Sequence, residues 1–301
     1  MYDLITYGDI TIDLFFKGKT LTQDKDRFAL AIGGKYQADS FYESLGGGGA
    51  NVAAGVAHFG FKTAVFGRVG NNPFKQMILQ KLLGRHVASE FIIEKENYLN
   101  LSSILLTEEG ERTIIHYVSS NEPLTVPEKY EKRLVQTKMM YMGNMPDTTL
   151  SEKIRILNFY KKNNITICLN IGIADCRLPL AKIIELIRLA DIFVVNTHEF
   201  AELVKKEVKE IDFKENCLPY LKNDKTTLFV TDSTNGSYGY NRSNVYFQKP
   251  IDKGKRIDAT GAGDAYVSGL VSAYLENLPI QKAMIQASNY AGLKITRIGA
   301  Q

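Results

Sequence analysis

Residues 258–274 read Asp-Ala-Thr-Gly-Ala-Gly-Asp-Ala-Tyr-Val-Ser-Gly-Leu-Val-Ser-Ala-Tyr, a glycine turn that leads directly into a helical run. Gly261 and Gly263 allow a tight turn and a close approach of the backbone to a ligand. Because the first amides of a helix have no partner within the helix, they favour an anion at this end. The segment therefore predicts an anion-binding loop formed by Gly261, Ala262 and Gly263, with Asp264 beside it.

Asp264 has two conceivable roles in this loop. An acidic residue in the first turn of a helix is stabilised by the helix dipole, so Asp264 could serve only as a cap. If a phosphate binds to the amides, the same carboxylate can accept a proton from an attacking hydroxyl while the amides stabilise the developing negative charge. Asp258 lies on the other side of the turn. Two aspartates around a Gly-Ala-Gly turn favour the second role.

The rest of the chain alternates between strand and helix patterns. Short apolar runs separated by helical patterns predict a parallel sheet covered by helices on both faces. Two regions, about 14–46 and about 101–118, instead alternate with a period of two residues and contain glycines, so we expect a smaller antiparallel sheet there. The predicted strands are 2–8, 62–67, 138–142, 165–169, 191–195 and 226–231, the predicted helices lie near 50–60, 72–84, 150–163, 179–190, 197–207 and 264–277, and 232–244 is predicted as a hairpin turn.

Composition limits the classes of function. The chain of 301 residues is 45% hydrophobic and 23% charged, which is typical of a globular protein. Its net charge of +4 is small and its basic residues are scattered, which argues against nucleic acid as a partner. No secretory leader and no apolar run of roughly 18 residues is evident, so we expect a cytoplasmic protein without membrane contact. The spacing of Cys168, Cys176 and Cys217 matches no zinc pattern and predicts buried free thiols.

The segment 258–264 is similar to the C-terminal signature of the ribokinase-like, or PfkB, family of carbohydrate kinases. A second segment, Gly46-Gly-Gly-Gly-Ala-Asn51, opens a helical run and resembles the substrate-side motif of that family. The resemblance implies that Gly47, Gly48 and Asn51 contact the substrate. Glycines let a polyol lie against the backbone, and the Asn51 amide can both donate to and accept from a sugar hydroxyl. The same glycines are also compatible with a flexible hinge before a helix.

Two further segments match the family in the same order along the chain. Gly8-Asp-Ile-Thr-Ile-Asp13 resembles its opening segment, which implies that Asp13 binds substrate hydroxyls, although an Asp after a strand is also a common turn residue. Val194-Val-Asn196-Thr-His-Glu199 is similar to its Asn-x-x-Glu motif, which implies that Asn196 and Glu199 organise Mg²⁺ and phosphate through water. Asn196 and Glu199 are also spaced to form a helix capping box.

The nucleotide side of the resemblance lies in the last third of the chain. Leu228-Phe-Val-Thr231 followed by Gly236 resembles the strand and glycine turn that hold the nucleotide, with Ser233 where the family usually has glycine. Asn289 lies in the last helical segment, where the family lines its adenine pocket. The chain ends soon after the family's usual Gly-Ala pair, so we expect its closing helix to be missing or shortened.

The resemblance implies a Rossmann-like, three-layer α/β/α ribokinase-like fold in one domain over residues 1–301, with a β-sheet lid from about 14–46 and 101–118. It implies ATP-dependent phosphorylation of a hydroxyl on a small sugar, with Asp264 as general base and ATP and Mg²⁺ as cofactors. In this family the equivalents of Asp258 and Thr260 often help to hold a monovalent cation, so activation by K⁺ is a further expectation.

Two other functions stay open. The acceptor could be a nucleoside, since aromatic side chains in the predicted lid could stack on a base. They could equally form the lid's own core and the interface of a homodimer. A ligand-binding homologue without catalysis is the remaining alternative, although retention of Asp264 argues against it. The aromatic residues concerned are Phe15, Phe16, Phe28, Tyr36, Phe41 and Tyr42.

Overall fold

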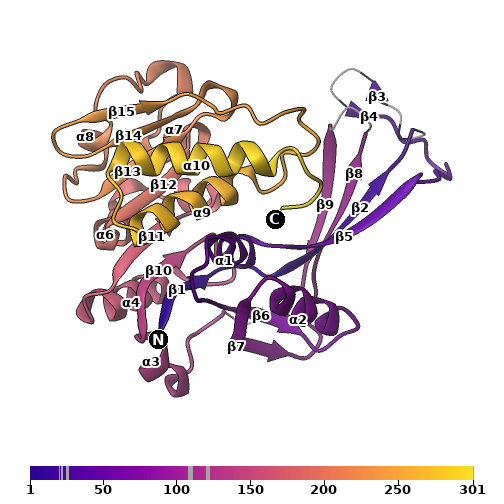
Figure 1. The fold of residues 1–301 in the computed structure, drawn as a ribbon, viewed down its shortest axis with the longest axis horizontal. Coiled ribbons are helices and arrows are strands. Elements are labelled where there is room, and N and C mark those ends of the chain that lie inside the picture. The colour runs from indigo at the N-terminus through magenta and orange to yellow at the C-terminus, as the bar shows by residue number, and fades with distance from the viewer. Residues whose placement is uncertain (20, 22, 25–26, 108–110, 120–122, 301) are drawn as a thin grey trace.

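The computed structural model describes residues 1–19, 21, 23–24, 27–107, 111–119 and 123–300 (Figure 1). Its main feature is a nine-stranded sheet with the order β15-β14-β13-β12-β11-β10-β1-β6-β7. The edge strand β15 pairs antiparallel with β14, β14 pairs antiparallel with β13, and all the other neighbours are parallel. The strands are β1 (Tyr2–Tyr7), β6 (Thr63–Gly70), β7 (Val87–Lys95), β10 (Thr137–Met142), β11 (Thr166–Asn170), β12 (Ile192–Asn196), β13 (Thr227–Thr231), β14 (Ser237–Tyr240) and β15 (Val245–Gln248).

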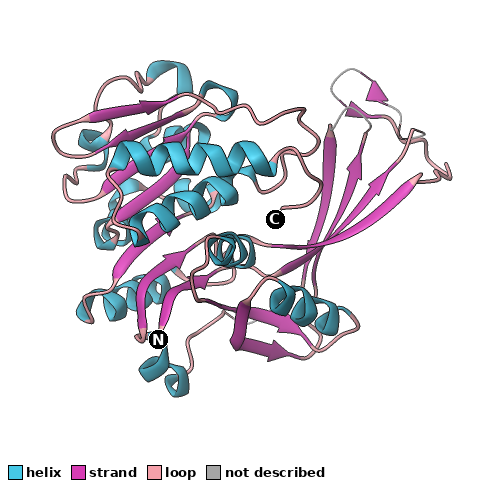
Figure 2. Ribbon diagram, in the orientation of Figure 1, coloured by secondary structure: helices cyan, strands magenta, loops and turns pink. Residues whose placement is uncertain are grey.

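Helices cover both faces of this sheet, as Figure 2 shows. One face packs against α1 (Gly48–His58), α9 (Ala262–Leu275) and α10 (Ile280–Lys294). The opposite face packs against α3 (Glu128–Leu134), α4 (Leu150–Lys162), α6 (Leu180–Leu189) and α7 (Thr197–Val204). The expected three-layer α/β/α arrangement is confirmed. The remaining helices are α2 (Phe74–Gly84), α5 (Ile173–Cys176) and α8 (Leu218–Leu221), with short 3-10 turns η1 (Val208–Glu210) and η2 (Ser233–Asn235).

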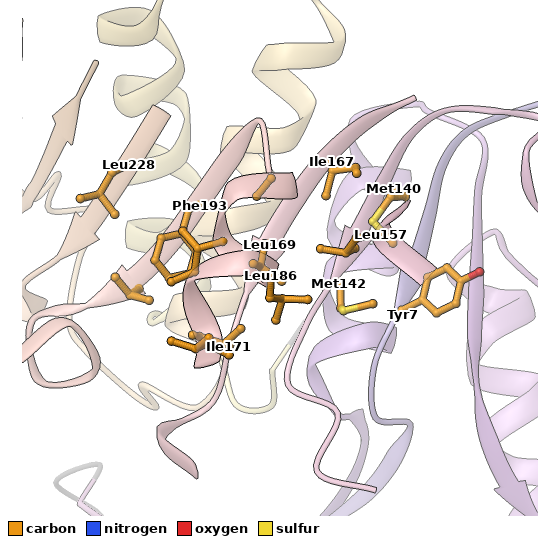
Figure 3. Packing of buried hydrophobic residues seen from close by; sticks show 14 of the residues in the cluster. Tyr7, Met140, Met142, Leu157, Ile167, Leu169, Ile171, Leu186, Phe193 and Leu228 are labelled. Atoms are coloured by element: carbon orange, nitrogen blue, oxygen red, sulfur yellow. The ribbon is translucent and has the colours of Figure 1, made fainter. Parts of the chain in front are cut away.

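Alternation along the parallel strands separates two cores. Successive side chains of a strand point to opposite faces, so Met140 and Met142 lie on one side while Met139 and Tyr141 lie on the other. Figure 3 shows the first side, where strand residues pack against Leu157 of α4 and neighbouring helical residues. Burying each such aliphatic side chain contributes roughly 1.5–3 kcal/mol. Short runs that are apolar at nearly every position are therefore the sequence signature of this sheet.

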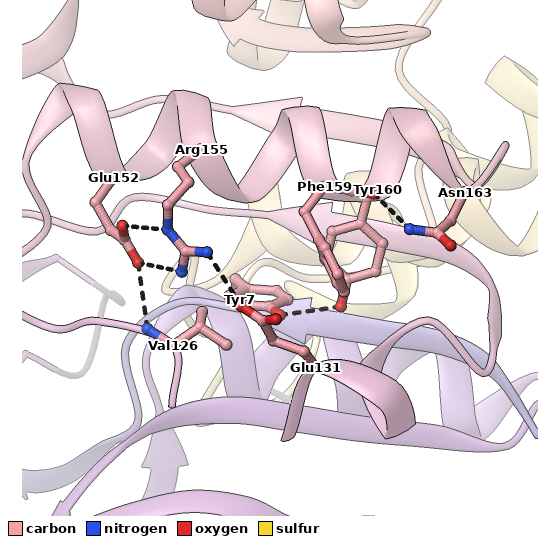
Figure 4. Close-up of polar contacts among 8 residues, drawn as sticks. All are labelled: Tyr7, Val126, Glu131, Glu152, Arg155, Phe159, Tyr160 and Asn163. Carbon is pink, nitrogen blue, oxygen red and sulfur yellow. Dashed lines mark hydrogen bonds and ion pairs between the residues drawn. The ribbon is translucent and has the colours of Figure 1, made fainter. Parts of the chain in front are cut away.

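Polar contacts attach α4 to its neighbours (Figure 4). Arg155 donates from Nε to Glu152 at 2.7 Å and from Nη1 to Glu131 of α3 at 3.2 Å. Below them, the hydroxyls of Tyr7 and Tyr160 share a buried hydrogen bond of 2.9 Å between β1 and α4. These contacts fix α4 against the strand that leads to the candidate site.

A second sheet has the strand order β5-β2-β8-β9. It was expected to be antiparallel, and this prediction is wrong for one pair, because β2 and β8 run parallel. The reason is that β2 follows β1 and β8 follows β7 after short connections, and β1 and β7 lie in the parallel part of the main sheet. Its strands are β2 (Thr11–Lys17), β5 (Ser40–Gly46), β8 (Asn100–Leu106) and β9 (Arg112–Val118), and a two-stranded ribbon adds β3 (Gln23–Asp24) and β4 (Arg27–Phe28).

Two other observations bear on the sequence predictions. The segment 232–244, predicted as a hairpin turn, contains β14, which pairs antiparallel with β13. The residues before β14, at 232–236, and those after it, at 241–244, form the turns on either side of this strand. Cys168, Cys176 and Cys217 are buried and free, as predicted. Among the described residues, no helix is both long enough and apolar enough to span a membrane.

Candidate active site

The loop before α9 has the conformation that its glycines predicted. Gly261 is the N-cap of α9 with φ of +73°, and a Cβ at this position would lie 2.6 Å from the Cβ of Ala300. The first helical hydrogen bond is donated by Ala265 N–H to Gly261 O at 2.9 Å. The N–H groups of Gly263 and Asp264 come before the donor of this bond in the chain, so they are available at the start of the helix to donate hydrogen bonds to an anion.

A cavity of about 250 Å³ adjoins this loop. Ala262 and Gly263 line it together with Thr231, at the end of β13, and Gly236, at the start of the edge hairpin. Gly236 has φ of +112°, a conformation that favours glycine. Arg256 adds a positive charge to a lining that is otherwise mostly small or apolar. The structure thus brings the predicted nucleotide-side residues Thr231 and Gly236 together with the predicted anion-binding loop.

Asn289 is not brought to this cavity. Its neighbours Ser288 and Gly292 line the cavity, whereas Asn289 lines a separate hollow with His58 and Phe59 on another side of α10. Each step along a helix rotates the side chain by roughly 100°, so a shift of one residue exchanges one face for another. Asn289 therefore lies on a different side of α10 from the residues that line this cavity.

Asp264 and Asn51 meet at the junction of α1 and α9. The Asn51 side-chain amide donates to Asp264 Oδ2 at 2.7 Å. A Cβ at Gly48 would lie 3.6 Å from Asp264 Oδ1, so this carboxylate faces the start of α1. Gly47, the N-cap of α1, has φ of +88° and packs so closely on the Asp9 carbonyl that a side chain would collide with it. The two glycine motifs, far apart in the chain, form one site.

The surroundings of Asp264 suit a proton acceptor. Burial raises the pKa of Asp264, whereas the hydrogen bond from Asn51 and the positive charge of Lys294 lower it. A carboxylate whose pKa lies above the usual range binds a proton more strongly, and general bases benefit from such a shift.

Asp13 lies on β2 with 6% of its surface exposed. Its carboxylate packs against the Cα of Gly46, and any side chain at position 46 would displace it. Burial raises the pKa of Asp13 to about 6, the hydrogen bond with Ser102 lowers it, and the negative charges of Asp264 and Asp258 raise it further. The Asp13 carboxylate is therefore near enough to Asp264 to be affected by its charge.

Asn196 and Glu199 form the capping box that their spacing allowed. Asn196 Oδ1 accepts from Glu199 N–H at 2.8 Å, and Glu199 Oε2 accepts from Asn196 N–H at 2.9 Å. Burial and the negative charge of Asp264 raise the pKa of Glu199, while the Asn196 amide lowers it. Part of each side chain is thus committed to α7. Among the described residues no cluster of three metal-ligating side chains occurs, so a metal ion here would depend on ligand phosphate and water.

Asp258 is fully buried, and both of its carboxylate oxygens accept hydrogen bonds. Its Oδ1 accepts from Thr260 N–H at 2.8 Å, and its Oδ2 accepts from Gly299 N–H at 3.0 Å. The ammonium of Lys294 lies 3.7 Å from Oδ2. Burial lowers the pKa of Lys294 to about 8, whereas Asp258 raises it. The hydroxyl of Thr260 is buried and has no hydrogen-bond partner.

Sequence reasoning missed three polar side chains near these groups. Ser102 of β8 bonds to Asp13, and its Oγ lies 3.2 Å from His116 Nδ1 of β9. Lys294 was also missed, although it follows Ala287 by seven residues and so falls on the buried face of α10. A lysine at an apolar position of a helical pattern was the available signal for this residue.

The chain matches one protein family along its whole length. The family model described as pfkB family carbohydrate kinase matches residues 1–301. The chain belongs to this family. This pfkB-family protein is 25% identical to the bifunctional protein HldE of Psychromonas ingrahamii, covering 98% of the chain but only 60% of that relative's length. It is also 25% identical to ribokinase of Bacillus subtilis, over 100% of the chain and 95% of that relative.

Solved structures confirm the ribokinase-like fold. Ribokinase of Arabidopsis thaliana, complexed with ribose and ATP, superposes with a TM-score of 0.80 at 19% identity and covers 99% of the chain and 94% of that structure. Burkholderia thailandensis nucleoside kinase, in complex with inosine, has a TM-score of 0.75 at 16% identity, with coverage of 99% and 93%.

Proposed function

We propose that this pfkB-family protein transfers a phosphoryl group from ATP to a hydroxyl of a small sugar. The observation that carries this proposal is the Asn51–Asp264 hydrogen bond of 2.7 Å. It joins the start of α1, on the acceptor side, to the anion-binding end of α9, on the cavity side. A carboxylate at this junction can reach an acceptor hydroxyl and a terminal phosphate together.

ATP would occupy the cavity between Thr231, Gly236 and the α9 loop, with its terminal phosphates over Gly261, Ala262 and Gly263. Mg²⁺ would supply positive charge to the phosphates, and the residues available to hold it through water are Asn196 and Glu199. Asp264 would remove the proton from the attacking hydroxyl. The free amides of α9 would stabilise the charge that develops on the transferred group.

The second sheet would serve as the lid of a single domain that comprises residues 1–301. Its strand β2 carries Asp13, whose carboxylate can accept hydrogen bonds from two neighbouring sugar hydroxyls. Parts of the predicted lid ranges, at 20, 22, 25–26 and 108–110, lie outside the described residues. Closure of the described strands over the acceptor would exclude water from the transfer and so suppress hydrolysis of ATP.

A nucleoside is the second candidate acceptor, and one residue favours it. Tyr42 is 41% exposed and pairs with Phe15, while Ser44 of the same strand pairs with Asp13, so Tyr42 lies on the Asp13 face of the second sheet. An exposed ring there could stack on a base. Phe15 is fully buried, and Phe16 packs on Phe41 at 5.4 Å between ring centroids, so these aromatics serve the sheet itself. The sugar is therefore the first choice.

The deciding experiment is a coupled assay of ADP release with ATP and Mg²⁺ against pentoses, hexoses, sugar acids and nucleosides. Release with a sugar supports the proposal and names its acceptor. Release only with a nucleoside selects the second candidate. If no compound in the panel causes ADP release but calorimetry still detects ATP binding, the result would instead indicate a ligand-binding homologue.

Replacing Asp13 by Asn should raise the KM for the acceptor by about 10- to 100-fold with little change in the KM for ATP, because a hydrogen bond to a charged group contributes about 1.5–3 kcal/mol. The raised pKa of about 6 also predicts the direction of the pH dependence. As pH falls through 6, Asp13 gains a proton, and kcat/KM for the acceptor should fall. The variant should lose the share of this acidic limb that comes from Asp13, while protonation of Asp264 continues to lower the rate at acidic pH. Asp39→Asn, at a carboxylate that accepts from Lys19 N–H at 2.8 Å, is the matched control. An effect confined to ATP would contradict the placement of Asp13.

The face of the second sheet opposite Asp13 would pair with a second copy of the chain. Phe41, Ile115 and Tyr117 share this face and are 53%, 61% and 56% exposed. Contiguous apolar surface of this kind commonly marks an interface. Light scattering should give a dimer for the native chain and a monomer for the double variant Phe41→Lys, Ile115→Lys. A monomeric native protein would refute this pairing.

The compartment proposed for this activity is the cytoplasm, where ATP is abundant. The three buried free thiols at Cys168, Cys176 and Cys217 suit a reducing environment.

A further inference from the structure

Lys294, the last residue of α10, is the most deeply buried ammonium near the candidate site. Only 2% of its side chain is exposed. Its Nζ donates to the main-chain oxygen of Asp258 at 2.9 Å and lies 3.7 Å from the Asp258 carboxylate. Burial of a charge is costly unless the charge is paired and hydrogen-bonded. The contact with Asp258 meets both requirements, and its position indicates what the buried charge does.

The contact lies directly behind the anion-binding loop. Asp258 begins the segment that leads to Gly261, and the N–H groups of Ile257 and Asp258 both donate to Ile295 O, at 2.8 and 3.2 Å. The loop is thus held on the C-terminal end of α10, where a helix dipole favours positive charge. The ammonium also acts electrostatically on Asp264.

A separate monovalent cation does not fit well at Asp258. Both carboxylate oxygens already accept amides, from Thr260 and Gly299, and the ammonium neutralises the remaining charge. A second cation held by this carboxylate would lie within a few ångströms of Lys294, in a buried region where like charges repel strongly.

We propose that the Lys294 ammonium takes the place of a bound monovalent cation in this chain, so that the enzyme works without K⁺. Lys294 is a positioning residue: it holds the 258–263 loop on α10 and supplies a positive charge of the chain's own behind the bound phosphates. This inference rests on the proposed kinase function, but part of its test does not.

The first test compares the native protein in KCl and in tetramethylammonium chloride at equal ionic strength. ADP release should agree within about twofold, and the melting temperature should be the same in both salts. Activation by K⁺ well beyond twofold, or a rise in melting temperature specific to K⁺, would overturn the proposal. Because the melting temperature needs no acceptor, this comparison still tests Lys294 if no acceptor is turned over and the proposed function fails.

The second test uses Lys294→Ala, which removes the ammonium together with the three methylene groups that carry it beyond Cβ. In tetramethylammonium chloride its turnover should fall by about tenfold or more. K⁺ or methylammonium should restore much of it and raise the melting temperature on the order of a few °C. Lys294→Arg, which keeps the charge, should stay indifferent to K⁺.

Lys153→Ala is the matched control, since Lys153 is a buried lysine paired with Asp175 at 2.6 Å, away from this loop. It should lose stability without any response to cations. If Lys294→Ala folds but neither its turnover nor its melting temperature responds to K⁺ or methylammonium, the lysine is only structural and the proposal fails. If that variant does not fold, the native comparison between the two salts decides.

Discussion

Asp264→Asn is expected to lower turnover by about 10²- to 10⁴-fold, the usual contribution of a positioned general base. The amide cannot take the proton of the acceptor hydroxyl, whereas it keeps the shape of the carboxylate. Stability should not fall, because burial raises the pKa of Asp264 and the charged form is therefore the one that folding disfavours. Coupled kinetics and thermal unfolding of the same preparation measure both quantities.

The control for this variant is Asp252→Asn. Asp252 is exposed and accepts from Gly254 N–H at 2.8 Å, in the segment that precedes the anion-binding loop. Substitutions at such surface sites usually change stability by less than about 0.5 kcal/mol. Calorimetry should show that Asp264→Asn still binds ATP. Unchanged turnover of Asp264→Asn would remove Asp264 from the role of base and leave it as a helix cap.

Asp258→Ala should destabilise the fold by about 3–5 kcal/mol, because removal of one partner of a buried pair leaves the other charge uncompensated. Here the orphaned groups are the Lys294 ammonium and the amides of Thr260 and Gly299. The free energy of unfolding from urea titration measures this loss directly.

Glu207→Ala provides the contrast for Asp258→Ala. Glu207 pairs with Lys209 at 2.7 Å, but both side chains are mostly exposed, at 68% and 80%. Exposed pairs contribute at most about 1 kcal/mol. A loss for Asp258→Ala as small as that for Glu207→Ala would mean that Lys294 finds water or releases its proton. The arrangement behind the anion-binding loop would then not be the rigid one described above.

Features set by neighbouring residues were predictable from the sequence. The turn at Gly261 needs a positive φ that glycine supplies, and the strand that ends at Asn196 is a short apolar run of the kind that parallel sheets bury. The capping box at Asn196 was also visible from its spacing. These are local rules, so one sequence is enough to apply them.

Features set by distant contacts were not predictable in the same way. The parallel pairing of β2 with β8 depends on how two strands leave another sheet. The position of Asn289 outside the lining of the cavity depends on the orientation of α10, which is determined by packing against α9 and the main sheet. The pairing of Lys294 with Asp258 depends on the same orientation.

The hydrogen bond between Asn51 and Asp264 spans 213 positions of the chain. Contacts between residues so far apart in the chain form slowly, because the entropy of the intervening chain is lost before the contact stabilises the fold. While the protein is being synthesised, α1 emerges well before its partner α9. Until α9 has been made and has docked on α1, Asn51 has no contact with Asp264, so this site cannot assemble on the earlier part of the chain alone.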